Sequence, residues 1–331
     1  MKQRLPDNIT ILAQSPRLRP DDIEVVVTVP TFRRPEHLLK TLQSVKAQAT
    51  ERRFAIIVME NDAEGQDGAK AVRPLFEDGT FRGILLVAHD RGNCNAYNAG
   101  WLTAVEQFKH FSALLVIDDD EIADPHWLEN MCRARETYAV DIVGGPQIPV
   151  FERPEQQKWA EHPVFAPPYE RSGQVPVVYS SGNLLVSRRV LETMPYPFLD
   201  LMFNFMGGGD SDFISRSVQK GFKVAWCAEA PIRETIPSRR LERDWIRARG
   251  LRNGVISTLV EKRKRVDEPL GRLRVIAKSL ALLAFSPFKA TVKALKSGSP
   301  SSGLYYIHVG LGRVLAEFGY ANEQYRQPEK N

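Results

Sequence analysis

Cysteine and histidine are scarce in this sequence of 331 residues, which holds three cysteines and six histidines. Cys94, Cys132 and Cys227 lie far apart and form no Cys-x-x-Cys pair, which argues against a structural zinc site and against a disulfide scaffold. An odd number of widely spaced cysteines is typical of reduced thiols. We therefore expect a protein of the cytoplasm.

Long hydrophobic runs are missing as well. No apolar run follows the first residues, Met1–Asp7, so we expect no secretory signal. The longest uncharged apolar stretch near the C-terminus is Ser279–Phe288, which is shorter than the roughly 20 residues that a bilayer-spanning helix needs. The sequence therefore predicts no spanning helix.

The chain as a whole also lacks a strong charge of one sign, with 45 basic and 40 acidic residues. Hydrophobic residues make up 43% and charged residues 26%, which is typical of globular proteins and excludes a disordered or collagenous chain. The segment from Arg233 to Lys296 differs, because it holds 17 basic and 6 acidic residues, a net charge of +11. Such a segment suits a phosphorylated ligand, an anionic membrane face or nucleic acid. No nucleic-acid motif supports the last of these.

Short apolar runs alternate with helical patterns along the first half of the chain. Residues 1–22 are polar and contain proline, and we expect a loose leader there. Strands are expected at 25–29, 54–59, 84–88 and 113–117, and helices at 35–49 and 96–111. Continuously apolar strands between helices indicate an α/β fold with a parallel sheet that is covered on both faces.

Ligands of such sheets bind beyond the carboxyl ends of the strands, and there the fourth apolar run is followed by Asp118, Asp119 and Asp120. Three adjacent carboxylates repel one another unless a divalent cation lies among them. Strand alternation predicts that Asp118 and Asp120 share a face and that Asp119 points away. The alternative is a solvated acidic turn before the next helix.

Two further segments could carry chemistry. Gly207–Asp212 places glycines, which allow a ligand close to the backbone, before Asp210 and Asp212 at a predicted helix start. Either aspartate could be a general base, or simply a helix cap. The arginine-rich segment 239–254 could hold a diphosphate, or form a solvated basic helix. A Gly-x-Gly-x-x-Gly dinucleotide fingerprint is absent.

Taken together, seven segments resemble, in order, the motifs of the family 2 inverting glycosyltransferases of the GT-A fold, and among them the exopolysaccharide (succinoglycan-type) glucosyltransferases of rhizobia. The segments are Val29–Pro35, Ile57–Asp62, Asn93–Gly100, Asp118–Asp120, Ser181–Asn183, Gly208–Phe213 and Trp245–Gly254. Each motif is weak alone, but seven in order are specific. The resemblance implies a Rossmann-like, mixed and mostly parallel sheet flanked by helices. It implies a GT-A domain over 23–262. For residues 263–331 the residue pattern itself predicts a basic amphipathic helical, membrane-associating extension.

The resemblance also implies roles for individual residues. Asp210 would be the catalytic base, and Asp118 and Asp120 would hold Mg²⁺ or Mn²⁺. The residues on the donor side would be Pro30, Thr31, Arg33, Glu60, Asn61, Asn98, Asp119, Arg249 and Arg252. Those on the acceptor side would be Gly182, Asn183, Gly208, Gly209 and Asp212. Two positions depart from the family pattern, because Gly209 replaces the usual Glu and Glu60 the usual Asp. Glu234 stands where related enzymes often carry a metal-binding histidine, and its role is open.

The function implied by the resemblance is inverting transfer of a hexose, such as glucose, from a nucleotide-sugar to a hydroxyl of a lipid-linked saccharide. A UDP-sugar is the family's usual donor, and the product would enter exopolysaccharide or lipopolysaccharide synthesis. Leu273, Leu280 and Phe288 alternate with basic residues, so the extension would lie on the cytoplasmic face of the inner membrane or, alternatively, pack on the domain. A non-catalytic nucleotide-sugar or membrane-binding module and a metal-dependent phosphohydrolase are the competing hypotheses.

Overall fold

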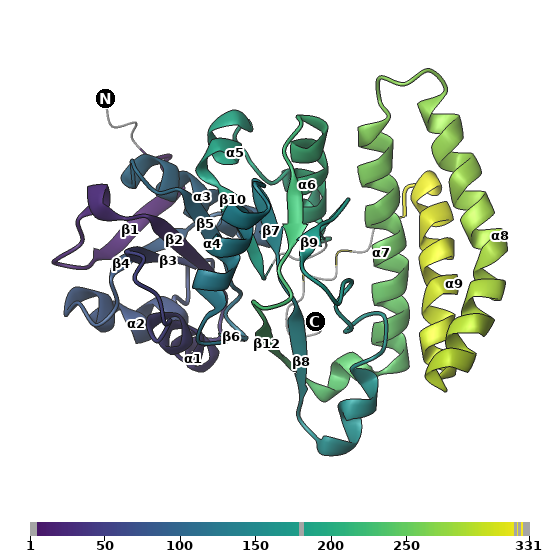
Figure 1. Ribbon diagram of the computed structural model, residues 1–331, viewed down its shortest axis with the longest axis horizontal. Coiled ribbons are helices and arrows are strands. Elements are labelled where there is room, and N and C mark those ends of the chain that lie inside the picture. Colours follow the sequence, from purple (N-terminus) through teal and green to yellow (C-terminus); the bar gives the residue numbers. More distant parts are fainter. Residues whose placement is uncertain (1–4, 179–181, 321–322, 324–325, 327–331) are drawn as a thin grey trace. The chain divides into compact units, whose positions relative to one another are not determined.

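The computed structural model describes residues 5–178, 182–320, 323 and 326, and the chain divides into two compact units (Figure 1). The first unit comprises Met1–Gln147, Pro168–Asn204 and Gly209–Glu234. The second comprises Ile148–Pro167, Phe205–Gly208 and Thr235–Asn331. The boundaries of these compact units differ from the predicted boundary at residue 262. The assignment of a GT-A domain to 23–262 and of a membrane-associating extension to 263–331 stays a prediction.

A nine-stranded mixed sheet forms the first unit, with strand order β1-β4-β3-β2-β5-β10-β7-β11-β9. Its parallel centre is made of the four apolar runs, β2 (Val25–Thr31), β3 (Phe54–Glu60), β4 (Gly83–Ala88) and β5 (Ala113–Val116). The remaining strands are β1 (Ile9–Gln14), β7 (Ile142–Gly144), β9 (Gly173–Gln174), β10 (Leu184–Ser187) and β11 (Val224–Trp226). This arrangement confirms the predicted mostly parallel α/β fold.

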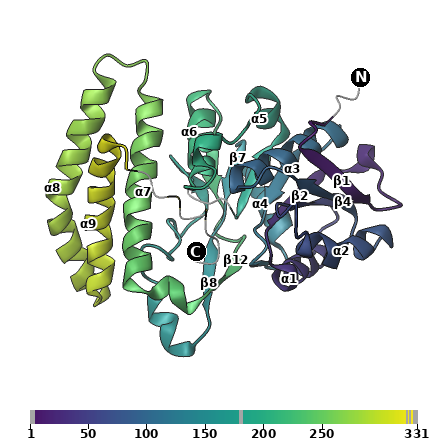
Figure 2. The same ribbon diagram turned by 180° about the vertical axis from the view of Figure 1, so that it is seen from behind.

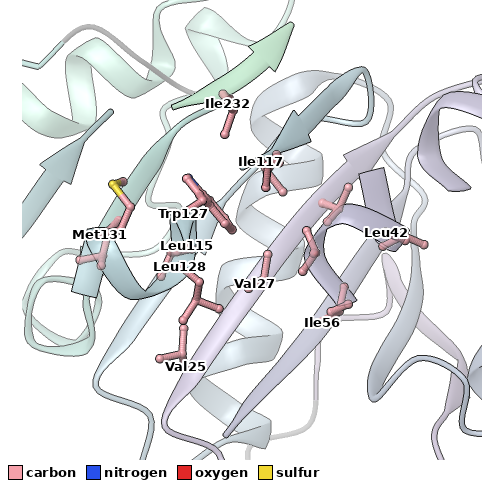
Figure 3. Packing of buried hydrophobic residues seen from close by; sticks show 14 of the residues in the cluster. Val25, Val27, Leu42, Ile56, Leu115, Ile117, Trp127, Leu128, Met131 and Ile232 are labelled. Carbon is pink, nitrogen blue, oxygen red and sulfur yellow. The ribbon is translucent and has the colours of Figure 1, made fainter. Parts of the chain in front are cut away.

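Helices cover both faces of this sheet (Figures 1 and 2). They are α1 (Pro35–Lys46), α2 (Asp67–Glu77), α3 (Asn93–Gln107), α4 (Trp127–Thr137), α5 (Arg188–Thr193) and α6 (Gly209–Gln219). On one face Val27 and Leu115 pack with Leu42 of α1 and Trp127 of α4 (Figure 3). On the other face α3 lies so close to β3 that a Cβ at Gly100 would stand 2.5 Å from the sulfur of Met59.

The expected loose leader over residues 1–22 is wrong for Ile9–Gln14. These residues form β1, which pairs antiparallel with β4, and Ile9 lies opposite Ala88. The segment is amphipathic rather than continuously apolar, since a strand at the edge of a sheet needs only one buried face.

A second sheet has three strands in the order β6-β12-β8, with β6 (Glu121–Ala123), β12 (Ile232–Ile236) and β8 (Gln147–Phe151). Glu234 of β12 lies opposite Glu121 of β6 in an antiparallel register. The first residue of β6 directly follows the three aspartates, so this sheet lies next to the candidate site.

The second unit contains α7 (Arg243–Lys264), α8 (Gly271–Ser297) and α9 (Pro300–Leu315), and α9 packs against both other helices (Figure 1). Short 3-10 helices complete the two units at Pro20–Asp22, Pro154–Trp159, Leu201–Phe203, Ser238–Leu241 and Ala316–Phe318. Among the described residues, α8 is long and apolar enough, by length and composition alone, to cross a membrane. The apolar stretch seen in the sequence was thus only part of a longer helix. Core helices of soluble proteins can pass the same test, but only 22% of the most apolar window of α8 is buried.

Candidate active site

The three aspartates form a turn immediately beyond β5, at the carboxyl edge of the parallel strands. The Thr31 hydroxyl, at the end of the neighbouring β2, donates a hydrogen bond of 2.8 Å to Asp119. The backbone N–H of Phe32 lies 3.4 Å from the same carboxylate oxygen. Asp119 therefore fastens the acidic turn to the end of β2, and the sheet fixes the position of its neighbours.

Arg34 contacts this turn, and the sequence patterns did not single it out. Its Nη1 lies 2.7 Å from Asp120 and 3.3 Å from Asp119. Asp119 and Asp120 thus share a partner, whereas Asp118 bonds a different residue, Tyr97. The prediction that Asp118 and Asp120 share a face and that Asp119 points away stays a prediction, because regular strand alternation ends with β5 at Val116.

Tyr97 of α3 is nearly fully buried, and its hydroxyl donates a 2.5 Å hydrogen bond to Asp118. The backbone N–H of Asp118 donates to Glu121, whose side chain also accepts from Gln147. Burial raises the pKa of Asp118 to about 7, and the charge of Asp120 adds to the effect. The charged form of this group is therefore costly without a nearby cation.

Asp119 is similarly affected. Burial raises its pKa to about 7, although Arg34 and the hydrogen bond from Thr31 act in the opposite direction. Glu121 has its pKa raised well above the ordinary value by burial and by Asp118 and Glu234. The Arg34 guanidinium thus lies beside several buried carboxyl groups.

Carboxylate oxygens are the donors that Mg²⁺ and Mn²⁺ prefer, so the chemistry of the acidic turn fits such an ion. Within the described part of the chain, no group of three His, Cys, Asp or Glu side chains is arranged to hold a metal by itself. In phosphate sites Mg²⁺ is usually bound by one or two carboxylates, and waters and phosphates complete its shell.

Glu60 is the last residue of β3 and Asn61 follows it, and the side chains of both form hydrogen bonds to backbone groups. The Glu60 carboxylate accepts 2.9 Å hydrogen bonds from the N–H groups of Asp62 and Ala69, and its side chain is inaccessible to solvent. Asn61 donates to the carbonyls of Ala88 and Asp90 and accepts from another backbone N–H. Both residues shape the loops of this edge, and a direct contact with a nucleoside stays a prediction.

Pro30 and Arg33 lie on either side of Thr31 and Phe32 at the end of β2. Arg33 adopts a left-handed backbone conformation with φ of 57°, and its Nε lies 2.6 Å from Asp62. This hydrogen bond lowers the pKa of Asp62. The side chain of Arg33 is 57% exposed, so this predicted donor-side residue is accessible to a ligand.

Asp210 begins α6 in the same unit as the acidic turn. Its charge contributes, after burial, to the raised pKa of Cys94 and also acts on Tyr97, the hydrogen-bond partner of Asp118. Gly209 is required for close packing, since a Cβ there would stand 2.7 Å from the sulfur of Cys94. The structure thus brings the predicted base and the predicted metal ligands to one region.

Asp212 and Asn98, predicted as an acceptor-side and a donor-side residue, both form contacts within the protein. Asp212 is buried and forms a 2.7 Å ion pair with Arg216 of the same helix. Asn98 is buried and bonds both backbone groups of Leu199. These contacts hold the loop before α6 and its first turn.

Of the predicted acceptor-side residues, Asn183 is inaccessible and bonds Trp127 and the carbonyls of Pro146 and Ala230. A Cβ at Gly182 would stand 2.4 Å from the Glu121 carboxylate, so a larger residue would collide with the acidic turn. Ser181 lies outside the described residues.

The remaining predicted residues belong to the second unit. Gly208 has φ of 92°, and a Cβ there would stand 2.5 Å from Ile256 of α7. On α7 the Arg249 guanidinium lies 5.8 Å from the ring centre of Trp245, whereas Arg252 is only 3% exposed. Their predicted contact with a diphosphate is untested.

Comparison with known proteins agrees with the geometry. Residues 26–194, about half of the chain, match the family model "Glycosyl transferase family 2". The chain therefore belongs to the family 2 glycosyltransferases, and it is a glycosyltransferase. It is similar to the succinoglycan biosynthesis protein ExoM of Rhizobium meliloti (strain 1021), with 29% identity over 239 residues that cover 71% of this chain and 74% of that protein.

Solved structures show the same fold at low identity. The mannosyltransferase PcManGT of Pyrobaculum calidifontis, solved with GDP-Man and Mn²⁺, has a TM-score of 0.54 and 16% identity, covering 90% of each chain. TarS 1–349 of S. aureus, solved with UDP, has a TM-score of 0.51 and 11% identity, covering 92% of this chain and 97% of that one. These neighbours establish the GT-A fold of this chain.

Proposed function

We propose that this protein transfers a hexose from a nucleotide-sugar, a UDP-sugar by the family's usual preference, to a hydroxyl of a lipid-linked saccharide. The observation that supports this most directly is the acidic turn at the carboxyl edge of the parallel strands, with Asp210 in the same unit. The similarity to a succinoglycan biosynthesis protein favours a place in exopolysaccharide synthesis, with lipopolysaccharide synthesis as the related case.

In the proposed reaction the acceptor oxygen attacks the anomeric carbon on the face opposite the diphosphate. The new C–O bond forms as the bond to the diphosphate breaks, and that electron pair leaves with the diphosphate. Asp210 takes the proton of the acceptor hydroxyl. A single displacement inverts the configuration of the anomeric carbon.

A divalent cation, Mg²⁺ or Mn²⁺, would be held by Asp118 and Asp120 and would supply positive charge near the leaving diphosphate. Tyr97 keeps the Asp118 carboxylate oriented through its 2.5 Å hydrogen bond. Thr31 and the backbone N–H of Phe32 hold Asp119 in place. Arg249 and Arg252 are the proposed arginine contacts of the diphosphate.

A thermal-shift panel of UDP, GDP, CDP and dTDP, each with Mn²⁺ or with EDTA, tests the donor half of this proposal. A ligand that binds only the folded state adds about 2.7 kcal/mol of stability at a concentration of 100 Kd. We expect a shift for one nucleotide that depends on Mn²⁺. The absence of a shift with all four would favour a phosphohydrolase or a different binding module.

The Asp210→Asn variant tests the catalytic half. Loss of a general base lowers kcat by about 10²- to 10⁴-fold, and nucleotide binding should remain. Asp78→Asn is the control, because Asp78 is an exposed aspartate after α2 whose carboxylate accepts a 2.7 Å hydrogen bond from the backbone N–H of Thr80. A fully active Asp210→Asn variant would refute the assignment and favour a non-catalytic binding module.

We further propose that the second unit associates peripherally with the cytoplasmic face of the inner membrane through α8. Large apolar side chains of this helix point outward: Leu273, Leu280, Phe285, Phe288 and Leu295 are 53–79% exposed. The buried positions of α8 are small instead, among them Ser279, Ser286 and Ala290. This is the reverse of a water-soluble helix, whose large apolar residues face the core.

The contact between α8 and α9 supports the same interpretation. A Cβ at Gly303 of α9 would stand 2.3 Å from the carbonyl oxygen of Ala290, and one at Gly310 would stand 3.1 Å from the Cα of Leu283. Close approach through small residues is common between helices in membranes. Exposed Arg272, Lys278, Lys289 and Lys296 place positive charge along α8, which suits anionic headgroups.

Co-sedimentation with vesicles of phosphatidylglycerol and phosphatidylcholine tests this proposal. Replacing the exposed Leu280 and Phe288 by Glu should weaken binding at least about tenfold, because each loses the benefit of apolar burial. Leu201→Glu, at a 48% exposed leucine of the first unit, is the matched control. Equal binding of the double variant and the control would show that α8 is not the membrane contact.

A further inference from the structure

The contact between Arg34 and the acidic turn has a consequence for metal binding. Arg34 directly precedes α1, and its side chain is 34% exposed. Asp120 and Asp119, which it contacts at 2.7 and 3.3 Å, have side chains that are only 12% and 8% exposed. The carboxylates are thus held in place, whereas the guanidinium reaches them from the solvent side.

Arg34 lies beside a group of neighbouring carboxylates. Asp118, Asp119 and Asp120 are consecutive, and Glu121 and Glu234 lie on adjoining strands of one small sheet. The guanidinium takes one acceptor site of the Asp120 carboxylate, and its positive charge at 2.7 Å opposes the approach of a second cation to the same group.

We propose that Arg34 is a built-in counter-ion of Asp120, which stabilises the metal-free enzyme and is displaced when a divalent cation binds. The inference rests on the proposed function in one respect, namely that Asp120 is a metal ligand. Arg34 then lowers the affinity for the free ion, because the cation must replace an existing ion pair. It also keeps the acidic turn in one conformation while no metal is bound.

The test is the Kd for Mn²⁺ without nucleotide, measured from the electron paramagnetic resonance signal of free Mn²⁺. Arg34→Gln should bind Mn²⁺ about tenfold more tightly than the wild type, since a competing unit charge next to Asp120 is gone. Arg34→Lys keeps the charge and should remain close to the wild type. Arg52→Gln, which removes a guanidinium from Glu129 and Glu136 of the same unit, is the control and should change nothing.

A second measurement covers the case in which Arg34→Gln does not fold without metal. Melting temperatures in EDTA and in Mn²⁺ should show a lower stability of Arg34→Gln in EDTA and a larger gain from Mn²⁺ than for the wild type. An unchanged or weaker Kd for Mn²⁺, an equal effect of Arg52→Gln, or a variant that stays unfolded in saturating Mn²⁺ would each overturn the inference.

The outcomes separate this inference from the proposed function. If the wild type binds Mn²⁺ together with a nucleotide but Arg34→Gln leaves the Kd for free Mn²⁺ unchanged, the transferase proposal stands and the role of Arg34 fails. If neither the wild type nor Arg34→Gln binds Mn²⁺ with any nucleoside diphosphate, Asp120 is not a metal ligand. The inference on Arg34 and the metal site of the proposed function are then both refuted.

Discussion

The hydrogen bond between Tyr97 and Asp118 leads to a quantitative prediction. Tyr97→Phe removes the 2.5 Å hydrogen bond and leaves the rest of the ring in its place against Trp101. A hydrogen bond to a charged group contributes about 1.5–3 kcal/mol. Because Tyr97 is 2% exposed, water has little access to replace the hydroxyl. At about pH 9, well above the pKa of about 7 that burial gives Asp118, we expect the free energy of unfolding in EDTA to fall by about 2 kcal/mol.

Tyr169→Phe is the matched comparison. The Tyr169 hydroxyl donates a 2.8 Å hydrogen bond to the neutral carbonyl of Val177, so its loss should cost only about 1 kcal/mol. Urea unfolding followed by tryptophan fluorescence measures both variants. If Asp118 is a metal ligand, saturating Mn²⁺ should reduce the penalty of Tyr97→Phe but leave that of Tyr169→Phe unchanged. Equal penalties for the two variants in EDTA would refute the argument.

Two further predictions concern the helices of the second unit. Glu261→Gln should cost about 3 kcal/mol at pH 7, because it breaks 2.7 and 2.8 Å ion pairs to Arg313 and Lys278 and leaves the nearly buried Arg313 uncompensated. Burial alone would raise the pKa of Glu261, but Lys278 and Arg313 outweigh burial and lower the pKa below 4.5. The loss of unfolding free energy in Glu261→Gln, measured in urea, should therefore persist above pH 4.5 and shrink in more acidic solution. A loss that is independent of pH would contradict this. Gly303→Val should separate α8 from α9 and lower the melting temperature, since its Cβ would collide with the carbonyl of Ala290, and an unchanged melting temperature would show that the helices are not closely packed.

Much of the fold could be predicted because the central strands are continuously apolar. Val25–Thr31 and its parallel neighbours are buried on both faces, and such runs are visible in a sequence. By contrast, α2 was not predicted, since it contains Pro74 and follows a glycine-containing loop. The edge strand β1 was missed because only one of its faces is buried.

The candidate site was predictable in its acidic residues but not in their partners. Arg34 and Asp120 are far apart in the sequence, and only the parallel pairing of β2 with β5 brings them together. Tyr97 is likewise an ordinary helix residue until α3 packs beside the turn. Asn61 and Asn183 were predicted as ligand-binding residues, and in the structure their buried amides bond backbone carbonyls. The sequence does not distinguish an asparagine with this structural role from one that binds a ligand.

The antiparallel strand β1 also affects how this protein behaves when its N-terminus is altered. Without β1, the N–H and C=O groups of the continuously apolar β4 would form an open edge of the sheet, which is a template for strands of other chains. β1 precedes β4 in the chain, so it can pair only after β4 has been made. A fusion or truncation that prevents Ile9–Gln14 from docking should therefore cause aggregation while leaving the acidic turn and its chemistry intact.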